Sequence, residues 1–192
     1  MTVQTKVLPN YEEEPIVISL KAITGLQYDQ ARFSVKPGAR VKLILTNSDD
    51  MSHNLVFTLP GARQDVVDAA LKLGDKGPEL SYVPKHQAVL WSIPLLSPGE
   101  SQSITFTVPE KPGVYPYVCT YPGHGFVMFG AMYVTEGAMP PLQDDLNIPT
   151  NRRGDNNKGS TGEHTAHVVP SHPYKETPPY LYHVFIADSG PA

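Results

Sequence analysis

The sequence predicts an all-β protein: a Greek-key β-sandwich with one inserted α-helix and an extended C-terminal arm. Two observations lead to this fold class. From about residue 15 to 135, apolar and polar residues alternate over short stretches, as in strands with one buried face. Pro-Gly pairs separate these stretches and mark tight turns, at 37–38, 60–61, 98–99 and 112–113. Many short strands joined by such turns are typical of a sandwich or a barrel.

The individual strands can be placed by their period. The clearest alternation lies at 103–108 (SITFTV), where apolar residues alternate with serine and threonine. Strands with the same period are expected at 16–21 and 41–46, and less regular ones at 53–59, 114–119 and 129–135. Pro116 falls inside one of them and lacks an N–H group, so that strand is expected at a sheet edge or with a bulge.

One stretch departs from the strand period and predicts the inserted helix. Residues 62–73 (ARQDVVDAALKL) place Val66, Ala70 and Leu73 at helical spacing, and Gly74 follows as a stop signal. A helix between two strands of a sandwich is expected to cover one end or flank of it.

Composition changes on both sides of the β region. We expect residues 1–14 to be a polar N-terminal extension, 15–138 to be the β domain, and 139–192 to be a Pro-rich linker or arm. The apolar run at 180–187 (YLYHVFIA) predicts that the arm ends in a docking segment. Histidine-rich tracts can capture metal, but the loose group in the arm is more simply explained as solvated side chains, at His164, His167 and His172.

Charge and composition exclude several classes of protein. The net charge of −4 and the absence of a basic stripe give no basis for a nucleic-acid partner. No apolar run is long enough for a membrane span. The single cysteine excludes an internal disulfide and a binuclear copper centre. The acidic N-terminus does not resemble a signal peptide, so the chain is expected to be cytoplasmic or a processed form.

The residues that carry chemistry lie in one loop, 119–128 (CTYPGHGFVM). It brings Cys119, His124 and Met128 together between two expected strands, and thiolate, imidazole and thioether are donors that copper prefers. The remaining donor is expected to be a histidine from a distant strand, and His53 is the natural candidate because it opens the strand at 53–59. Each residue alone has a structural explanation, but their coincidence in one loop favours a metal site.

This loop resembles the copper loop of the azurin-like cupredoxins, blue (type 1) copper proteins that include auracyanin and rusticyanin. The resemblance rests on its Cys-x4-His-x3-Met spacing and on residues 47–57 (NSDDMSHNLVF), which resemble the segment that supplies the first histidine. It implies a β-sandwich that holds one mononuclear type 1 copper. The implied ligands are three in a trigonal plane and one long axial sulfur: His53, Cys119 and His124, with Met128.

The same resemblance implies roles for residues beside the ligands. Asn54 resembles the asparagine that ties the two ligand loops together. The backbone N–H groups of Asn54 and Tyr121 would point at the Cys119 sulfur and tune the reduction potential. The carbonyl of Ser52 would lie near the opposite axial position, as a weak fifth contact.

From the resemblance we expect one-electron transfer between Cu(I) and Cu(II) by a carrier rather than an enzyme, since the protein donors leave no position open for a substrate. Expected partners are transient redox proteins, such as a cytochrome or a copper oxidoreductase, that approach His124 across an apolar rim at Pro122, Phe126 and Val127. The expected location is the periplasm or another extracytoplasmic space. Two alternatives stay open: a copper-handling or storage module, and the electron-entry domain of a larger multi-domain oxidoreductase.

Overall fold

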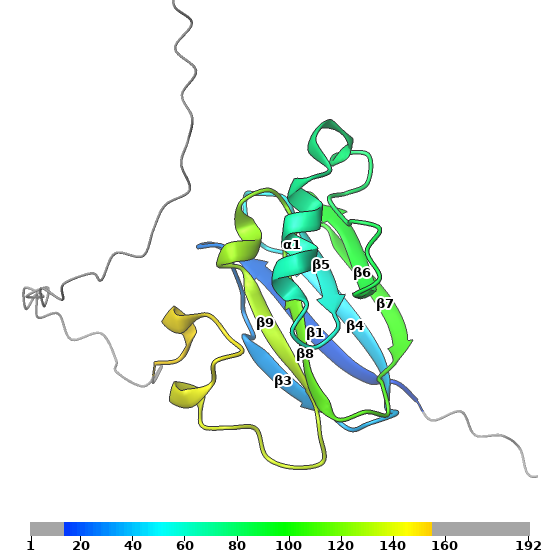
Figure 1. The fold of residues 1–192 in the computed structure, drawn as a ribbon, viewed down its shortest axis with the longest axis vertical. Helices are drawn as coiled ribbons and strands as arrows, with labels where there is room; N and C mark the ends of the chain where they lie inside the picture. The colour runs from blue at the N-terminus through cyan, green and yellow to red at the C-terminus, as the bar shows by residue number, and fades with distance from the viewer. Residues whose placement is uncertain (1–13, 155–192) are drawn as a thin grey trace, which may run out of the picture. The chain divides into compact units, whose positions relative to one another are not determined.

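The computed structural model describes residues 14–154, and its strands form the two layers of a sandwich (Figure 1). One sheet has four strands in the order β2-β1-β4-β7, which span Gln27–Tyr28, Ile16–Ile23, Arg40–Asn47 and Ser101–Thr107. The other has five in the order β3-β9-β8-β5-β6, which span Arg32–Val35, Phe129–Val134, Gly113–Val118, His53–Thr58 and Val89–Leu96. The predicted all-β sandwich with an inserted helix is confirmed.

The strand order brings two distant segments to the same end of the five-stranded sheet. The chain passes from the four-stranded sheet to the five-stranded sheet between β4 and β5, and it does so again between β7 and β8. Strands β5 and β8 are neighbours and run antiparallel, with Val56 opposite Val118. The start of β5 therefore lies beside the end of β8, and both ends carry residues of the predicted metal site.

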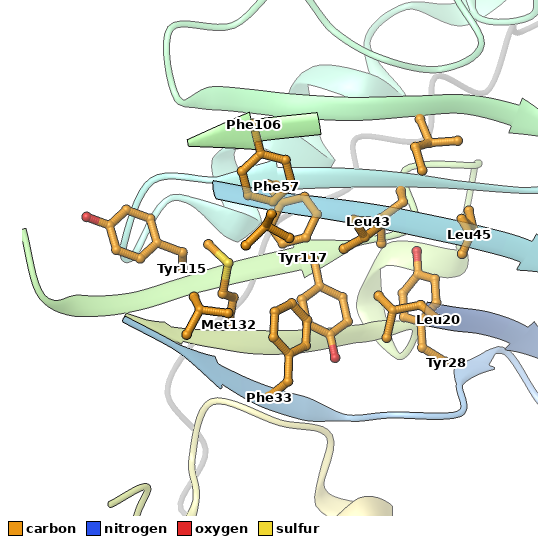
Figure 2. Close-up of a cluster of buried hydrophobic side chains, with 14 of the residues drawn as sticks. Leu20, Tyr28, Phe33, Leu43, Leu45, Phe57, Phe106, Tyr115, Tyr117 and Met132 are labelled. Carbon is orange, nitrogen blue, oxygen red and sulfur yellow. The ribbon is translucent and has the colours of Figure 1, made fainter. Parts of the chain in front are cut away.

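Alternating side chains of the two sheets form the core. On β4, Val41, Leu43 and Leu45 are fully buried while Lys42 is exposed, as the period-two pattern predicts. Aromatic rings fill much of the space between the layers (Figure 2). The centroid of the Phe57 ring lies 5.6 Å from that of Phe106 and 5.6 Å from that of Tyr117. Such close packing gives the ligand-bearing strands a stiff support.

The inserted helix α1, Arg63–Leu71, covers the outer face of the five-stranded sheet. Its Val66 and Val67 pack with Val56 and Val118, so β5 is buried on both faces. The predicted bounds 62–73 extend slightly beyond the helix, which ends before Gly74, a residue in the left-handed conformation with φ of 50°.

The expectation for Pro116 is wrong, because β8 lies inside the five-stranded sheet rather than at its edge. Its register with β9 passes through Pro116, opposite Ala131, without a shift. The ladder to β5 includes Tyr117 and Val118 but not Pro116. On that side the proline has no ladder hydrogen bond to lose, which explains how a central strand tolerates it.

The first part of the predicted arm, residues 139–154, packs on the sheet, and we call it the C-terminal strap. It contains the short 3-10 turns η3 (Leu142–Asp144) and η4 (Thr150–Arg152). Asp145 is buried, pairs with Arg32 at 2.9 Å and accepts a 2.6 Å hydrogen bond from the Tyr133 hydroxyl. Ile148 is buried against Ala131 and Tyr133 of β9. The arm histidines and the docking segment at 180–187 lie outside the described residues.

Replacing Gly130 by alanine is expected to lower the free energy of unfolding by about 3 kcal/mol, since overpacking a rigid core is costly. A Cβ atom at Gly130 would lie 2.3 Å from the ring of Tyr117. That ring is fully buried and its hydroxyl donates a 2.6 Å hydrogen bond to the Gln30 carbonyl, so it has little room to move. Urea unfolding measures the loss. The control is Gly154→Ala, where nothing lies near the new atom, and an equal loss in both variants would contradict the packing argument.

Candidate metal centre

The predicted ligands come from three points at one end of the sandwich. His53 is the first residue of β5, and Cys119 directly follows β8. The loop after Cys119 turns through η2 (His124–Phe126) and reaches Met128 just before β9. The antiparallel pairing of β5 with β8 and of β8 with β9 therefore gathers residues that are far apart in the sequence.

Two imidazole rings face one thiol. The Nδ1 atom of His53 lies 3.8 Å from the Cys119 sulfur, and the Nδ1 atom of His124 lies 3.6 Å from it. The candidate donor atoms of the three residues all lie within 4.8 Å of one another, and all three side chains are buried. This spacing leaves room for a single ion between them.

Met128 is held in the same loop by the backbone. Its N–H donates a 2.8 Å hydrogen bond to the His124 carbonyl, and its carbonyl accepts a 3.0 Å hydrogen bond from the Cys119 N–H. These two bonds close the loop on itself, and the Met128 side chain is fully buried. A cysteine, a histidine and a methionine are thus fixed on one closed turn of chain.

Helix α1 supports this loop from outside. The Arg63 guanidinium donates a 2.8 Å hydrogen bond to the Gly125 carbonyl and lies over the Phe129 ring, 3.9 Å from its centroid. Gly125 has no space for a side chain, because a Cβ atom there would lie 2.6 Å from Val67. Arg63 and Val67 carry no motif, so neither could be assigned to the site from the sequence.

Asn54 links the two ligand segments through its side chain. Its Nδ2 group donates 2.8 Å hydrogen bonds to the Thr120 hydroxyl and to the Ser81 carbonyl, and its Oδ1 accepts a 2.7 Å bond from the Thr120 N–H. Its own carbonyl accepts a 2.7 Å bond from the buried Tyr28 hydroxyl. The residue after His53 is therefore tied directly to the residue after Cys119.

Burial controls the protonation of the thiol. Loss of solvent raises the pKa of Cys119 to about 11, although hydrogen bonds from the backbone N–H groups of Asn54 and Tyr121 act in the opposite direction. Burial and the neighbouring His53 ring lower the pKa of His124 below its usual value. Near neutral pH the site thus holds a protonated thiol beside a neutral His124, and a metal ion must displace the thiol proton.

A carboxylate that the sequence did not indicate contacts the site. Asp49 is 6% exposed, and its Oδ2 lies 2.9 Å from the Nε2 atom of His53, on the side of the ring away from Cys119. Burial tends to raise the pKa of Asp49, but hydrogen bonds to His53 and to Asp50 outweigh it and lower the pKa below its usual value. In the sequence, the only sign of this contact is that Asp49 stands four residues before His53.

The donor set fits a type 1 copper site. Trigonal copper electron-transfer sites bind the ion through two imidazoles and one cysteine sulfur, with a methionine sulfur as a weak further donor. Both imidazoles turn Nδ1 toward the sulfur, and the Nε2 atom of His53 is already engaged by Asp49. No rearrangement of the ring is needed to present a lone pair to an ion.

Comparison with known families identifies this arrangement. The sequence profile of the copper binding proteins of the plastocyanin/azurin family matches residues 17–135, which is more than half of the chain. The chain belongs to this family. The expected azurin-like resemblance is confirmed, and the fitted cofactor is the copper ion of a cupredoxin.

Individual relatives of this cupredoxin agree. It is 27% identical over 110 residues to Auracyanin-A of Chloroflexus aurantiacus, covering 57% of this chain and 67% of that protein. It is 31% identical over 115 residues to Auracyanin-B of the same organism, covering 58% of this chain and 48% of that protein. The chain thus spans about half the length of Auracyanin-B.

Solved structures show the same fold. The auracyanin A structure from Chloroflexus aurantiacus matches with a TM-score of 0.57 at 27% identity, covering 64% of this chain and all of that one. Dithionite-reduced auracyanin from Roseiflexus castenholzii matches with a TM-score of 0.56 at 30% identity, covering 62% of this chain and 96% of that one. The C-terminal strap lies beyond the residues that the family profile matches.

The surface beside the cupredoxin copper loop is apolar. Phe126 and Val127 are 53% and 50% exposed, whereas His124, the first residue of η2, is buried. A cleft of about 330 Å³ separates these two residues from the strap, lined by Arg63, Phe126, Val127, Phe129, Pro149, Thr150, Asn151 and Arg153. The two exposed apolar side chains thus border a cleft with arginines on its walls. Within residues 14–154, no helix is long and apolar enough to cross a membrane.

Proposed function

We propose that this chain carries single electrons through one copper ion that is bound by His53, Cys119, His124 and Met128. The observation that carries this proposal is the convergence of two Nδ1 atoms on one buried thiol, 3.8 and 3.6 Å away. The methionine on the same closed loop supplies the weak sulfur donor that distinguishes type 1 copper from other sites. Copper would supply the Cu(II)/Cu(I) couple, and the protein would supply a rigid set of donors that allows fast electron transfer.

The protein makes cycling fast by holding the donors still. Asn54 joins the two ligand segments with two side-chain hydrogen bonds to Thr120, and Arg63 fixes the loop at Gly125. Cys119 and Met128 are fully buried, which keeps water away from both sulfurs. Donors that move little between the two oxidation states lower the reorganisation that each transfer requires.

The backbone N–H groups of Asn54 and Tyr121 tune the thiolate. Both are directed at the Cys119 sulfur, where they lower the pKa of the thiol against the larger effect of burial. The same hydrogen bonds withdraw charge from the sulfur when it is bound to copper, which favours Cu(I) and raises the reduction potential.

Electrons enter and leave near His124, in the same loop as the exposed side chains of Phe126 and Val127. A small apolar rim of this kind suits brief encounters with redox partner proteins such as a cytochrome or a copper oxidoreductase, since weak complexes bury little area. Four protein donors leave no open position for a substrate, so the role is that of a carrier rather than an enzyme. We place it in the periplasm or another extracytoplasmic space, in keeping with its membership of the cupredoxins.

The proposal is tested by adding Cu(II) to the metal-free protein and recording visible absorption. We expect an intense blue or green band that saturates at about one copper per chain and bleaches reversibly on reduction. A colourless protein, or one that takes up several ions without the band, would contradict it and would favour copper handling instead.

Binding of Cu(II) between about pH 7 and pH 8 is expected to release about one proton per ion, because the buried Cys119 thiol, with its pKa near 11, must become a thiolate. The apparent affinity should then rise about tenfold per pH unit below that pKa. Proton release is measured with an indicator dye in weak buffer. Uptake without proton release would show that the thiol is not a ligand.

A further inference from the structure

Asp49 lies in the turn between β4 and β5. Its carboxylate contacts the Nε2 atom of His53, the ring nitrogen that faces away from Cys119. Asp49 is nearly fully buried and His53 is completely buried. The two side chains therefore interact where the dielectric constant is low and a charge acts strongly.

The turn holds the carboxylate in place through separate bonds. The Asp49 N–H donates a 3.1 Å hydrogen bond to Oδ1 of Asn47, and the Asp50 N–H donates a 2.9 Å bond to Oδ1 of Asp49. Asn47 is itself fixed by its Nδ2 group, which donates to the Met51 and Leu96 carbonyls. One carboxylate oxygen thus anchors the turn, and the other, Oδ2, is left to accept from His53.

The geometry points to Asp49 as a positioning residue that sets the reduction potential of the copper site through His53. This inference rests on the proposed function. When Nδ1 of His53 binds the metal, the ring proton must be on Nε2, where it would be donated to Oδ2 of Asp49, 2.9 Å away. A carboxylate in that position fixes the tautomer, makes the imidazole a stronger donor and places a negative charge behind it.

The direction of the effect follows from charge. A stronger, more negative imidazole stabilises Cu(II) more than Cu(I), because the interaction grows with the charge of the ion. Asp49 therefore lowers the potential, and it opposes the N–H groups of Asn54 and Tyr121, which raise it. The working potential is set by the balance of these two influences, one acting through His53 and the other on the Cys119 sulfur.

The test is Asp49→Asn, which removes the charge and keeps one oxygen for a hydrogen bond. We expect the affinity for Cu(II) relative to Cu(I) to fall about tenfold, in the range found for partners of metal-bound histidines. That change corresponds to a rise in potential of about 59 mV. Asp49→Ala, which removes both the charge and the hydrogen bond, should raise it at least as far. The potential is measured by redox titration of the blue band.

The matched control is Asp75→Asn, which removes the same charge from an exposed position and should leave the potential unchanged. An Asp49→Asn protein that is blue but has the wild-type potential would overturn the inference. So would an equal shift in the control, since it would show that net charge alone is responsible.

A measurement on the wild type covers the case in which the variants fail to fold. In the Cu(I) protein, the Nε2 proton of His53 should give a nuclear magnetic resonance signal that exchanges slowly with water, and rapid exchange would overturn the inference. A wild type that never turns blue would instead reject the proposed function. The metal-free protein would then still show whether the ring proton of His53 is shared with Asp49.

Discussion

Replacement of Asn54 by alanine is expected to lower the free energy of unfolding by about 4 kcal/mol. The side chain makes three hydrogen bonds of 2.7 to 2.8 Å and is completely buried. Each neutral bond contributes about 1 kcal/mol, and the Thr120 N–H that loses its acceptor adds a desolvation cost of similar or larger size. Urea unfolding of the metal-free protein measures the loss without interference from copper.

The same variant should also loosen the site. Without Asn54, the segment that carries His53 is no longer tied through Thr120 to the segment that carries Cys119. We expect the copper-bound variant to show a broader or weaker visible band than the wild type. The control is Asn151→Ala, an exposed position on the strap, where the change should stay within about 0.5 kcal/mol. A loss below about 1 kcal/mol in Asn54→Ala would contradict the linking role.

Cys119→Ser is expected to abolish the intense visible band and to weaken Cu(II) binding by at least about a hundredfold. Loss of a residue that only hydrogen-bonds to a metal ligand already weakens binding by up to about a hundredfold, and Cys119 is itself a ligand. The band requires a copper–thiolate bond, and Cys119 is the only cysteine in the chain. The serine hydroxyl does not ionise near neutral pH, so the proton release on binding should disappear as well. Absorption titration and the indicator dye measure both changes on the same sample.

A matched histidine variant separates this effect from general damage. His86 lies outside the donor cluster, and its Nδ1 accepts a 3.2 Å hydrogen bond from the Ala88 N–H. His86→Gln should retain the full band and the wild-type affinity. Retention of the band in Cys119→Ser, or its loss in His86→Gln, would place the metal elsewhere.

The strands and the copper loop could be predicted because their signals are local. The alternation of Val41, Leu43 and Leu45 with polar neighbours reports a half-buried strand directly, and each of the three side chains is buried as expected. The donor types of the loop at 119–128 lie close together in the sequence. One turn of chain is enough to bring them to a single ion.

The rest depends on contacts between distant segments. The position of β8 inside the sheet could not be derived from Pro116, because sheet order is decided by partners elsewhere in the chain. Arg63 reaches Gly125 only because α1 lies over the end of β8. The strap packs through Asp145 and Ile148, which stand in a stretch without any apolar period.

Asp49 is a contact of a different kind, since it is close to His53 in the sequence. Aspartate in a turn is ordinarily explained by its bonds to the backbone, and Asp49 does accept one from the Asp50 N–H. Only the three-dimensional structure shows that the second carboxylate oxygen meets the histidine ring.

One-electron transfer at a copper ion that stays bound can be measured by a spectroelectrochemical titration of the copper-loaded protein. We predict that the blue band disappears and returns along a one-electron curve, with about 59 mV for each tenfold change in the ratio of oxidised to reduced protein. The copper content should remain at about one per chain over repeated cycles. Release of copper on reduction, with loss of the band on reoxidation, would contradict electron transfer and identify a protein that binds and delivers Cu(I).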